Sequence, residues 1–590
     1  MPLNDSHWAD RLHVLATETE VVGAALGIWH DGVQITAAHG VLSSATQVDI
    51  TPDTLFQIGS ITKVWTTSMI MQLVDEGRLS LDSTIAELLP GVQICRPDRA
   101  YQVGVRDLLA HRSGIDGDIF ADTGRNDDCV ERYVHLLADA TTTFPVGAAY
   151  SYCNSGFVLL GRIIEALDGR TWEKALHERL IRPLGLTNTV TLAEQAILHR
   201  TAIGHRERPH TQEPVSIWGL PRGIGPAGLI CADVGDVLAF ARLHLDRGLA
   251  PDGRRLLTAE SVEAMQTPHM PIPAVDAPDD AVGLGWHLTS WGRRRIVGHD
   301  GGTIGQRAYL RLDPEAGLAV CLLTNSSVSP GLYERLFGEI FEEYVGVRPP
   351  VLVPPEDVDI ELDLERHTGR YERTSARFDV SLRAGELHAL AQPTGDAALF
   401  DEEPQDLVLR PVDPQGTTFL TRAHEDDPWS PIAFSAFPDG SPYLFSGGRV
   451  TPKVKVSAVD RAYAQAWLDR YVAAWLSYDP NDIAALFSDD IAYRYHPYDD
   501  PIVGREAVVA SWLGEDDSNA ASTRDAPGTY AAHYEPVAVD GEVVVATGTS
   551  TYRERPDGPI VRVYDNCFVM RFDAEGRCRE FTEYYLRRPA

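Results

Sequence analysis

A proline-rich stretch near the middle of the chain limits how its 590 residues can be arranged. Residues 345–363 read VGVRPPVLVPPEDVDIELD. Proline has no backbone N–H and clashes inside a helix, so neither a helix nor a central strand can continue through this segment. Because chains of this length usually form several domains of about 100–200 residues, we expect a linker at 346–364 that follows a first domain at 1–345.

The part of the chain after this linker changes character once more. Residues 365–457 consist of short alternating apolar and polar runs between Gly, Asp and Pro turns, which is typical of a small β-barrel. Residues 458–590 begin with the aromatic-rich helical pattern AYAQAWLDRYVAAWLSYD and end in strand-like runs such as EVVVATGTSTYRER. This order, helices first and a curved sheet after them, predicts an α+β domain.

The first domain combines helical and strand periodicities. Val21–Trp29 and Val33–His39 flank an Asp-Gly turn, which is a hairpin signal. Long amphipathic stretches follow, and strand-like RRRIVGHD and LAVCLLTNS come near the end. Strands at both ends of the segment with helices between them indicate one α/β sheet assembled from distant parts of the chain. The whole chain is therefore expected to be an α+β multidomain protein.

The charge balance excludes several classes of partner. The chain has 52 Lys and Arg against 85 Asp and Glu, a net charge of −33. Nucleic acids and anionic membranes attract clusters of basic residues, so we expect neither as a partner. The start MPLNDSHWADRLHVLATETE lacks a secretory signal pattern, and no apolar run reaches the roughly 18 residues of a membrane helix. A cytoplasmic location is expected.

Patterns typical of metal and cofactor sites are missing or incomplete. The seven cysteines are scattered without a CxxC pair, which argues against a zinc site or a disulfide framework. Gly223–Gly228 fits GxGxxG, but no strand clearly precedes it and Pro226 lies inside it, so a dinucleotide site is not expected. GxSxG and HExxH do not occur. We therefore expect no metal and no cofactor.

The segment TLFQIGSITKVWTT (54–67) carries the most informative pair, Ser60 and Lys63. Three residues apart at the start of a helix, they would lie on one face within reach of each other. A serine hydroxyl is a weak nucleophile unless a base takes its proton, and a desolvated lysine can act as that base. Taken alone, the SxxK spacing could equally be an accident of sequence.

Two other segments carry polar groups that suit the same chemistry. Tyr152 and Asn154 lie in a polar turn before an apolar helix. A phenol near a lysine can exist partly as phenolate and carry protons, and an amide can orient a carbonyl, although Asn154 could simply cap the helix. Residues 298–302, GHDGG, follow a strand-like run. They could supply an oxyanion-hole N–H or form only a glycine-rich hairpin.

In their order, these segments resemble the serine beta-lactamase-related hydrolases of class C type, which include D-aminopeptidases, DD-carboxypeptidase-like proteins and esterases. The resemblance covers about residues 10–345 and rests on FQIGSITK, VRDLLAHRSGI, YSYCNSGFVLLG, IRPLGLTNT, GPAGLICADVGDVLAFARLHL, VGLGWHL and GHDGGTIG. It implies an antiparallel sheet flanked by helices, together with an all-helical lobe, and places the serine between them.

The resemblance also implies a role for each candidate residue. Ser60 would be the acylated nucleophile, and Lys63 would be its hydrogen-bonded base. Tyr152 would move the proton to the leaving group and later activate water. Asn154 would contact the substrate acyl side chain or Lys63. The backbone N–H groups of Ser60 and Gly302 would form the oxyanion hole.

One motif departs from the family pattern. Penicillin-recognising members usually carry Lys-Thr/Ser-Gly where this chain has His299, Asp300 and Gly301. Asp300 would repel a substrate carboxylate, whereas His299 could donate a hydrogen bond or carry a partial positive charge. We therefore expect hydrolysis of an ester or amide, with an uncharged acyl substrate or one that bears an amine, such as a D-amino-acid-type substrate. Acyl transfer and β-lactam or DD-peptide cleavage are alternatives, and a non-catalytic binding or sensor protein is an alternative of another class.

The last two domains also resemble known modules. Residues 365–457 resemble the lipocalin-like barrels that follow the catalytic domain in D-aminopeptidase-like members, which serve as packing modules or send a loop over the active site. Residues 458–590 resemble the SnoaL-like branch of the NTF2-like superfamily, an open cone that serves as an enzyme, a binder or a dimerisation module. We expect a homodimer formed through this domain, or a silent pocket. The residues that could line the cone are Tyr493, Tyr495, His496, Asp565 and Glu583.

Overall fold

The computed structural model describes residues 5–208, 211–273, 280–355, 363–395, 404–423, 427–454, 459–514, 524–573 and 576–589. The chain divides into two compact units, Met1–Val454 and Lys455–Ala590. Residues 356–362 of the predicted linker, and the predicted boundary at 457–458, lie outside the described residues. Within those residues, no helix has the length and apolar character needed to cross a membrane.

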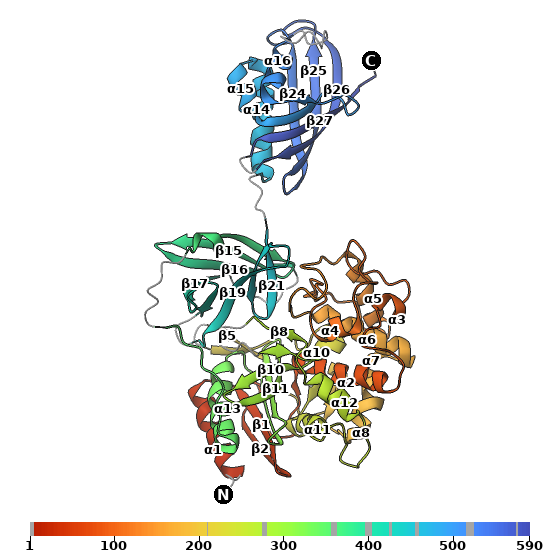
Figure 1. Cartoon of the computed structure of the whole chain (residues 1–590), viewed down its shortest axis with the longest axis vertical. Coiled ribbons are helices and arrows are strands. Elements are labelled where there is room, and N and C mark those ends of the chain that lie inside the picture. Colours follow the sequence, from red (N-terminus) through yellow and green to blue (C-terminus); the bar gives the residue numbers. More distant parts are fainter. Residues whose placement is uncertain are drawn as a thin grey trace. The chain divides into compact units, whose positions relative to one another are not determined.

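An antiparallel sheet forms the centre of the first domain (Figure 1). Its strand order is β2-β1-β13-β12-β11-β10-β9-β8, so the N-terminal hairpin pairs with the last strand of the domain. This confirms the predicted sheet assembled from distant parts of the chain. The strands are β1 Gly23–His30, β2 Val33–Gly40, β8 Met270–Pro271, β9 Ala281–Val282, β10 His287–Trp291, β11 Arg294–Thr303, β12 Gln306–Asp313 and β13 Leu318–Thr324.

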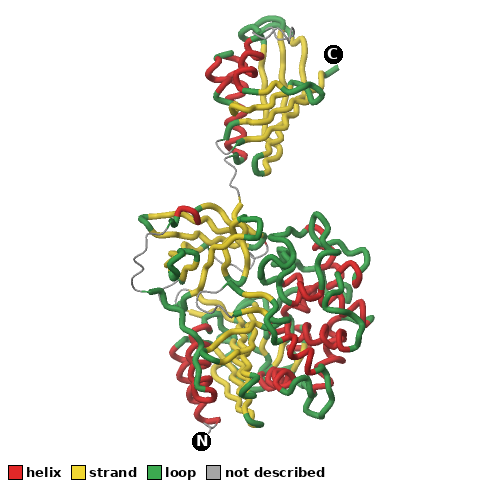
Figure 2. Tube along the Cα trace, viewed as in Figure 1, coloured by secondary structure: helices red, strands yellow, loops and turns green. Residues whose placement is uncertain are grey.

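Both faces of this sheet are covered, because alternate residues of its central strands are apolar. Leu26 and Ile28 of β1 pack with α1 (Asp5–Glu18) and α13 (Pro330–Val345), while Ala25 faces the core shared with α11 (Val234–Leu245). The remaining helices form a lobe beside the sheet (Figure 2). They are α2 Thr62–Asp75, α3 Ile85–Leu88, α4 Val105–Leu109, α5 Cys129–Leu136, α6 Asn154–Asp168, α7 Trp172–Leu176, α8 Arg182–Leu184, α9 Ala193–Ala196, α10 Gly225–Gly228 and α12 Ala259–Met265.

Short strands connect the lobe to the sheet, and a closed barrel follows. The short strands are β3 Phe56–Gln57, β4 Thr189–Val190, β5 His205–Arg208, β6 Thr211–Pro214 and β7 Cys231–Ala232. The barrel strands are β14 Gly369–Arg373, β15 Ala376–Arg383, β16 Glu386–Pro393, β17 Gln405–Pro411, β18 Thr418–Thr421, β19 Ser430–Ala436, β20 Pro442–Ser446 and β21 Arg449–Val454. The predicted barrel is thus confirmed, and its Phe437 and Phe445 pack against Phe144 and Tyr150 of the lobe.

The second unit is an α+β cone, as predicted. A sheet with the order β23-β22-β27-β26-β25-β24 encloses an aromatic core that includes Trp467 and Tyr471 of the first helix. Its elements are α14 Arg461–Ser477, α15 Pro480–Ala484, α16 Arg505–Leu513, β22 Phe487–Arg494, β23 Ile502–Val503, β24 Tyr530–Asp540, β25 Val543–Arg553, β26 Ile560–Phe572 and β27 Cys578–Arg587.

Side chains alternate between the two faces of each strand, and this alternation decides which of the residues that could line the cone point inward. Tyr493 is buried, and Tyr495 and Glu583 are half-buried. Glu583 accepts a hydrogen bond from the side chain of Asn566 (2.6 Å). Asp565, one residue earlier on β26, is exposed and pairs with Arg588. Of these candidates, Asp565 therefore points away from the interior, because successive side chains of a strand point to opposite faces.

Candidate active site

Ser60 and Lys63 meet where the lobe joins the sheet. Ser60 lies in the 3₁₀ turn Gly59–Ile61, which leads directly into α2. The Lys63 Nζ atom lies 2.9 Å from Ser60 Oγ and donates to the carbonyl of Ala227 (2.7 Å). Lys63 is fully buried, and this burial lowers the pKa of its amine well below the ordinary value. The pair therefore combines a hydroxyl with an adjacent amine that can be neutral.

Glycines allow β11 to approach the Ser60 turn very closely. A Cβ atom placed on Gly301 would lie 1.9 Å from the carbonyl oxygen of Ile58 and 3.2 Å from the backbone N of Ser60. A Cβ atom on Gly59 would lie 2.7 Å from the backbone N of Gly302. Only residues without a side chain fit this contact. The backbone of β11 thus runs directly beside the backbone N–H of Ser60.

Tyr152 faces the same pair from the turn before α6. The Lys63 Nζ atom lies 4.8 Å from the centre of its ring, and the ring stacks on His111 with centroids 4.4 Å apart. The Tyr152 hydroxyl is buried and lies near the Ser60 hydroxyl. Burial raises the pKa of Tyr152, while the hydroxyl of Ser60 opposes that rise. This disfavours the partial phenolate that the sequence suggested and makes Tyr152 a proton donor at rest.

Asn154 is held differently from what the sequence suggested. Its Nδ2 atom donates to Oδ1 of Asp118 (2.8 Å), and no hydrogen bond to Lys63 is found among the described residues. The cap of α6 is Cys153, whose Sγ atom accepts from the N–H of Gly156, so Asn154 is not the capping residue either. The side-chain oxygen of Asn154 takes no part in the hydrogen bond to Asp118.

His299 and Asp300 also differ from expectation. His299 is buried and its Nδ1 atom lies 2.7 Å from the carbonyl oxygen of Asp300, so Nδ1 carries the proton and Nε2 is an acceptor. Burial and the neighbouring His287 and Lys63 lower the pKa of His299 well below its ordinary value, which disfavours the partial cation. Asp300 pairs with Arg311 (3.1 Å), so its charge is compensated rather than free to repel a carboxylate.

Several groups at this site were missed by sequence reasoning. Asp118 lies in a segment without a recognised pattern, His287 lies in the VGLGWHL motif but was not singled out, and Arg373 and Arg449 belong to the barrel. The Gly447-Gly448 turn just before Arg449 was the only local signal that a hairpin tip lies here. In the described part of the chain, no cluster of three or more His, Cys, Asp or Glu side chains could hold a metal ion.

A groove of about 860 Å³ begins beside the Ser60 turn. Leu229 and Ile304 line it and follow directly on Gly228 and Thr303, and Gly228 lies against Gly59. Other apolar side chains in its wall include Trp218 and Leu220. Ser60, Lys63 and Tyr152 are not among the residues that line this groove.

Comparisons with known proteins agree with this architecture. The "Beta-lactamase" family profile matches residues 8–343, and that of the "SnoaL-like domain" matches residues 468–581. Penicillin-binding protein 4 of Amycolatopsis lactamdurans is 42% identical over 376 residues, or 63% of this chain and 99% of that protein. Unguisins hydrolase ungD' of Aspergillus campestris is 27% identical, covering 52% of this chain and 61% of its own. A crystal structure of SurE is 29% identical with a TM-score of 0.63, covering 76% of this chain and 99% of SurE.

Proposed function

This chain belongs to the beta-lactamase family, and on that premise we propose that it is a serine hydrolase that cleaves an ester or amide bond through an acyl-enzyme on Ser60. The contact between the Ser60 hydroxyl and the buried amine of Lys63 supports this proposal most directly. A binding or sensor protein has no need for a buried basic amine beside a serine.

The first half of the reaction follows from these positions. The Ser60 Oγ atom attacks the substrate carbonyl carbon, and its proton passes to the neutral Lys63 amine. The negative charge on the carbonyl oxygen is stabilised by the backbone N–H groups of Ser60 and Gly302, which the close approach of β11 brings together. Tyr152 gives its hydroxyl proton to the leaving oxygen or nitrogen and recovers one from Lys63. The C–O or C–N bond breaks, and the acyl-enzyme remains.

Water then reverses this sequence. The phenol–amine pair removes a proton from water, the hydroxide adds to the ester carbonyl, and the proton returns to Ser60 Oγ as the acid leaves. An alcohol or amine in place of water would give acyl transfer. His299 presents an Nε2 acceptor to this region, which suits a substrate that carries an N–H or O–H donor.

For the substrate we favour an amide or ester of a D-amino-acid type. SurE was crystallised with D-Leu, and that structure is 28% identical to this chain with a TM-score of 0.61. The neutral His299 supplies no cation for a carboxylate, unlike the Lys of penicillin-recognising members. The similarity to a protein named Penicillin-binding protein 4 keeps β-lactams as the alternative.

The test compares the native chain with Ser60→Ala. We expect a fluorophosphonate to label only the native chain, with a tryptic peptide that maps the label to Ser60. Release of p-nitroaniline from D- and L-leucine p-nitroanilide, and of p-nitrophenol from acyl esters, then ranks the substrates. A fluorescent penicillin tests the alternative. Labelling that survives Ser60→Ala, or never occurs, would contradict the hydrolase proposal.

For the second unit we propose self-association. The exposed face of its sheet carries apolar side chains of β26 and β27, including Val569, Tyr584 and Leu586. Sedimentation of the native chain and of a chain ending at residue 454 tests this. A dimer that persists after the deletion would place the interface elsewhere.

A further inference from the structure

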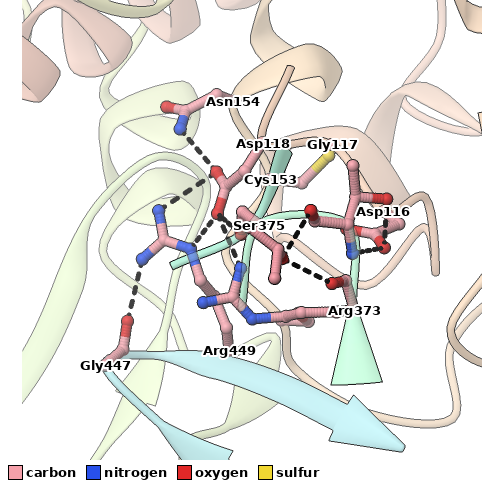
Figure 3. A network of polar contacts seen from close by, with 12 residues as sticks. Asp116, Gly117, Asp118, Cys153, Asn154, Arg373, Ser375, Gly447 and Arg449 are labelled. Atoms are coloured by element: carbon pink, nitrogen blue, oxygen red, sulfur yellow. Dashed lines mark hydrogen bonds and ion pairs between the residues drawn. The ribbon is translucent and has the colours of Figure 1, made fainter. Parts of the chain in front are cut away.

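Asp118 is a buried carboxylate shared by two domains (Figure 3). From the lobe it accepts a hydrogen bond from Asn154. From the barrel it accepts from Arg449 at 2.5 and 3.2 Å, from Arg373 at 3.2 Å and from Ser375 at 3.3 Å. A buried carboxylate without such partners would be strongly destabilising. The ionised form of Asp118 therefore depends on the barrel.

Arg449 also reaches the proposed proton donor. It follows the turn that joins β20 to β21, and its Nη1 atom donates to the carbonyl of Gly447 (2.8 Å). The carbonyl of the next residue, Gly448, accepts the backbone N–H of Tyr152 (2.9 Å). The guanidinium carbon of Arg449 lies 4.9 Å from the centre of the Tyr152 ring. One barrel hairpin thus touches both the backbone and the ring of Tyr152.

We propose that Asp118 and Arg449 are positioning residues, through which docking of the barrel fixes Asn154 and Tyr152 opposite Ser60 and Lys63. The inference rests on the hydrolase function proposed above. It makes the barrel part of the active site and not only a packing module. Neither residue needs to touch the substrate for this role, because Asp118 acts through Asn154 and Arg449 acts through Tyr152, which lies beside Lys63.

The same ion pair sets the charge around Lys63. After burial itself, Arg449 lowers the pKa of Lys63 most and Asp118 raises it. Burial lowers the pKa values of the neighbouring histidines and raises those of the tyrosine and the thiol, so these groups are uncharged near neutral pH. They are His111, His287, His299, Tyr152 and Cys153. Asp118 and Arg449 are therefore the charged groups whose removal should shift the pKa of Lys63, and this shift should appear in the pH profile of the activity.

A matched control lies two residues away on the same loop. Asp116 is also buried and also binds the barrel, accepting from the N–H and hydroxyl of Thr374 at 2.6 and 2.7 Å. It makes no hydrogen bond to Asn154. Replacing it therefore weakens domain docking without freeing Asn154.

The first experiment measures kcat and KM of the full chain for Asp118→Asn and Asp116→Asn. An amide at 118 no longer neutralises two guanidinium groups, so Asn154 and Tyr152 shift; we expect kcat to fall about 10²-fold and KM much less. Asp116→Asn should lower the melting temperature but keep kcat within about twofold. Equal losses of kcat in the two variants, or no loss in Asp118→Asn, would overturn the proposal.

The second experiment follows kcat/KM against pH. Removing the positive charge with Arg449→Met favours protonated Lys63, so the acidic limb should move to higher pH. Removing the negative charge with Asp118→Asn should move it to lower pH, and Arg449→Lys should restore the native limb in part. If the acidic limbs of Arg449→Met and Asp118→Asn moved in the same direction, or did not move, the assignment would be contradicted. A general loss of folding would not move the limb to higher pH in one variant and to lower pH in the other.

A structural readout separates this inference from the hydrolase proposal. If the native chain neither turns over a substrate nor labels at Ser60, the hydrolase proposal fails. Crystal structures of Asp118→Asn and Asp116→Asn still decide the positioning role. We expect the Asn154 amide to turn away in the first and to stay in place in the second. An unmoved Asn154 and Tyr152 in Asp118→Asn would overturn the inference.

Discussion

The Nζ atom of Lys63 lies 2.9 Å from the Oγ atom of Ser60, at the point where a 3₁₀ turn passes into α2. Both residues belong to one continuous piece of backbone, so their separation is set by local geometry and not by packing between distant segments. The surroundings decide the chemistry instead. Lys63 is fully buried, and only a neutral amine there can accept the hydroxyl proton.

The activity should therefore depend on the protonation state of Lys63. Burial lowers the pKa of this amine well below 10.5, so we expect fluorophosphonate labelling of Ser60 to remain fast well below pH 10.5. Labelling should be lost as the pH falls through the pKa of Lys63 in the folded protein. Lys63→Arg, whose guanidinium stays charged, should slow labelling by about 10²–10⁴-fold at every pH. An acidic limb near pH 10.5 would contradict this account.

The close approach of β11 gives a second prediction. Gly301→Ala would place a methyl group 1.9 Å from the carbonyl oxygen of Ile58. Because the methyl group is fixed to the backbone of β11 and its neighbour is a backbone oxygen, the strand must move away from Ser60 and separate the N–H groups of the proposed oxyanion hole. We expect about a 10²-fold lower kcat or more in ester hydrolysis.

Gly331→Ala is the control for this substitution. Gly331 lies in helix α13, where the new methyl group would meet only Thr19 at an ordinary 3.7 Å. Alanine favours a helix by about 1 kcal/mol over glycine, so this variant should melt no lower than the native chain. Native kcat in Gly301→Ala would show that β11 does not form the oxyanion hole.

Most of the architecture could be predicted from the sequence. The change of periodicity predicted the barrel and the cone, but the proline-rich segment does not divide the compact units, because the first domain and the barrel form one unit that ends at Val454. The spacing of Ser60 and Lys63 predicted that their side chains meet. Such features are local, because they depend on neighbouring residues within one turn or one strand.

The Asp118 network could not be predicted for the opposite reason. Arg449 is 331 residues from Asp118 in the sequence, and no local pattern reports a pairing over that separation. The sequence also left the charge states of His299 and Tyr152 open, because they follow from burial by side chains that come from several elements. Sequence spacing shows which groups are near in the chain, and burial decides whether they are charged.

Acid sensitivity should come partly from a histidine far from the proposed chemistry. His244 of α11 is buried against Phe240 and Trp286, and burial lowers its pKa to about 3. Below pH 6.5 the unfolded chain binds this proton and the folded chain does not, so stability falls with pH until the folded pKa is reached. Between pH 6.5 and 5 this amounts to about 2 kcal/mol.

We expect His244→Phe to weaken this dependence. The native chain should lose more stability than His244→Phe when urea unfolding is compared at pH 7 and pH 5. His177→Gln serves as the control, since His177 is exposed and should leave the dependence unchanged. The same loss in the native chain and in His244→Phe would mean that other groups cause the acid sensitivity.

Two truncations should separate the roles of the following domains. A chain of residues 1–454 corresponds to a compact unit, so it should fold and label at Ser60 at the native rate. A chain of residues 1–345 lacks Arg373 and Arg449, so Asp118 loses the cations that fix its position. The apolar face around Phe144 and Tyr150, which the barrel covers, would be exposed. We expect this shorter chain to melt at lower temperature or to aggregate, and to label at Ser60 far more slowly. If residues 1–345 alone labelled at the native rate, the barrel would be dispensable for the chemistry.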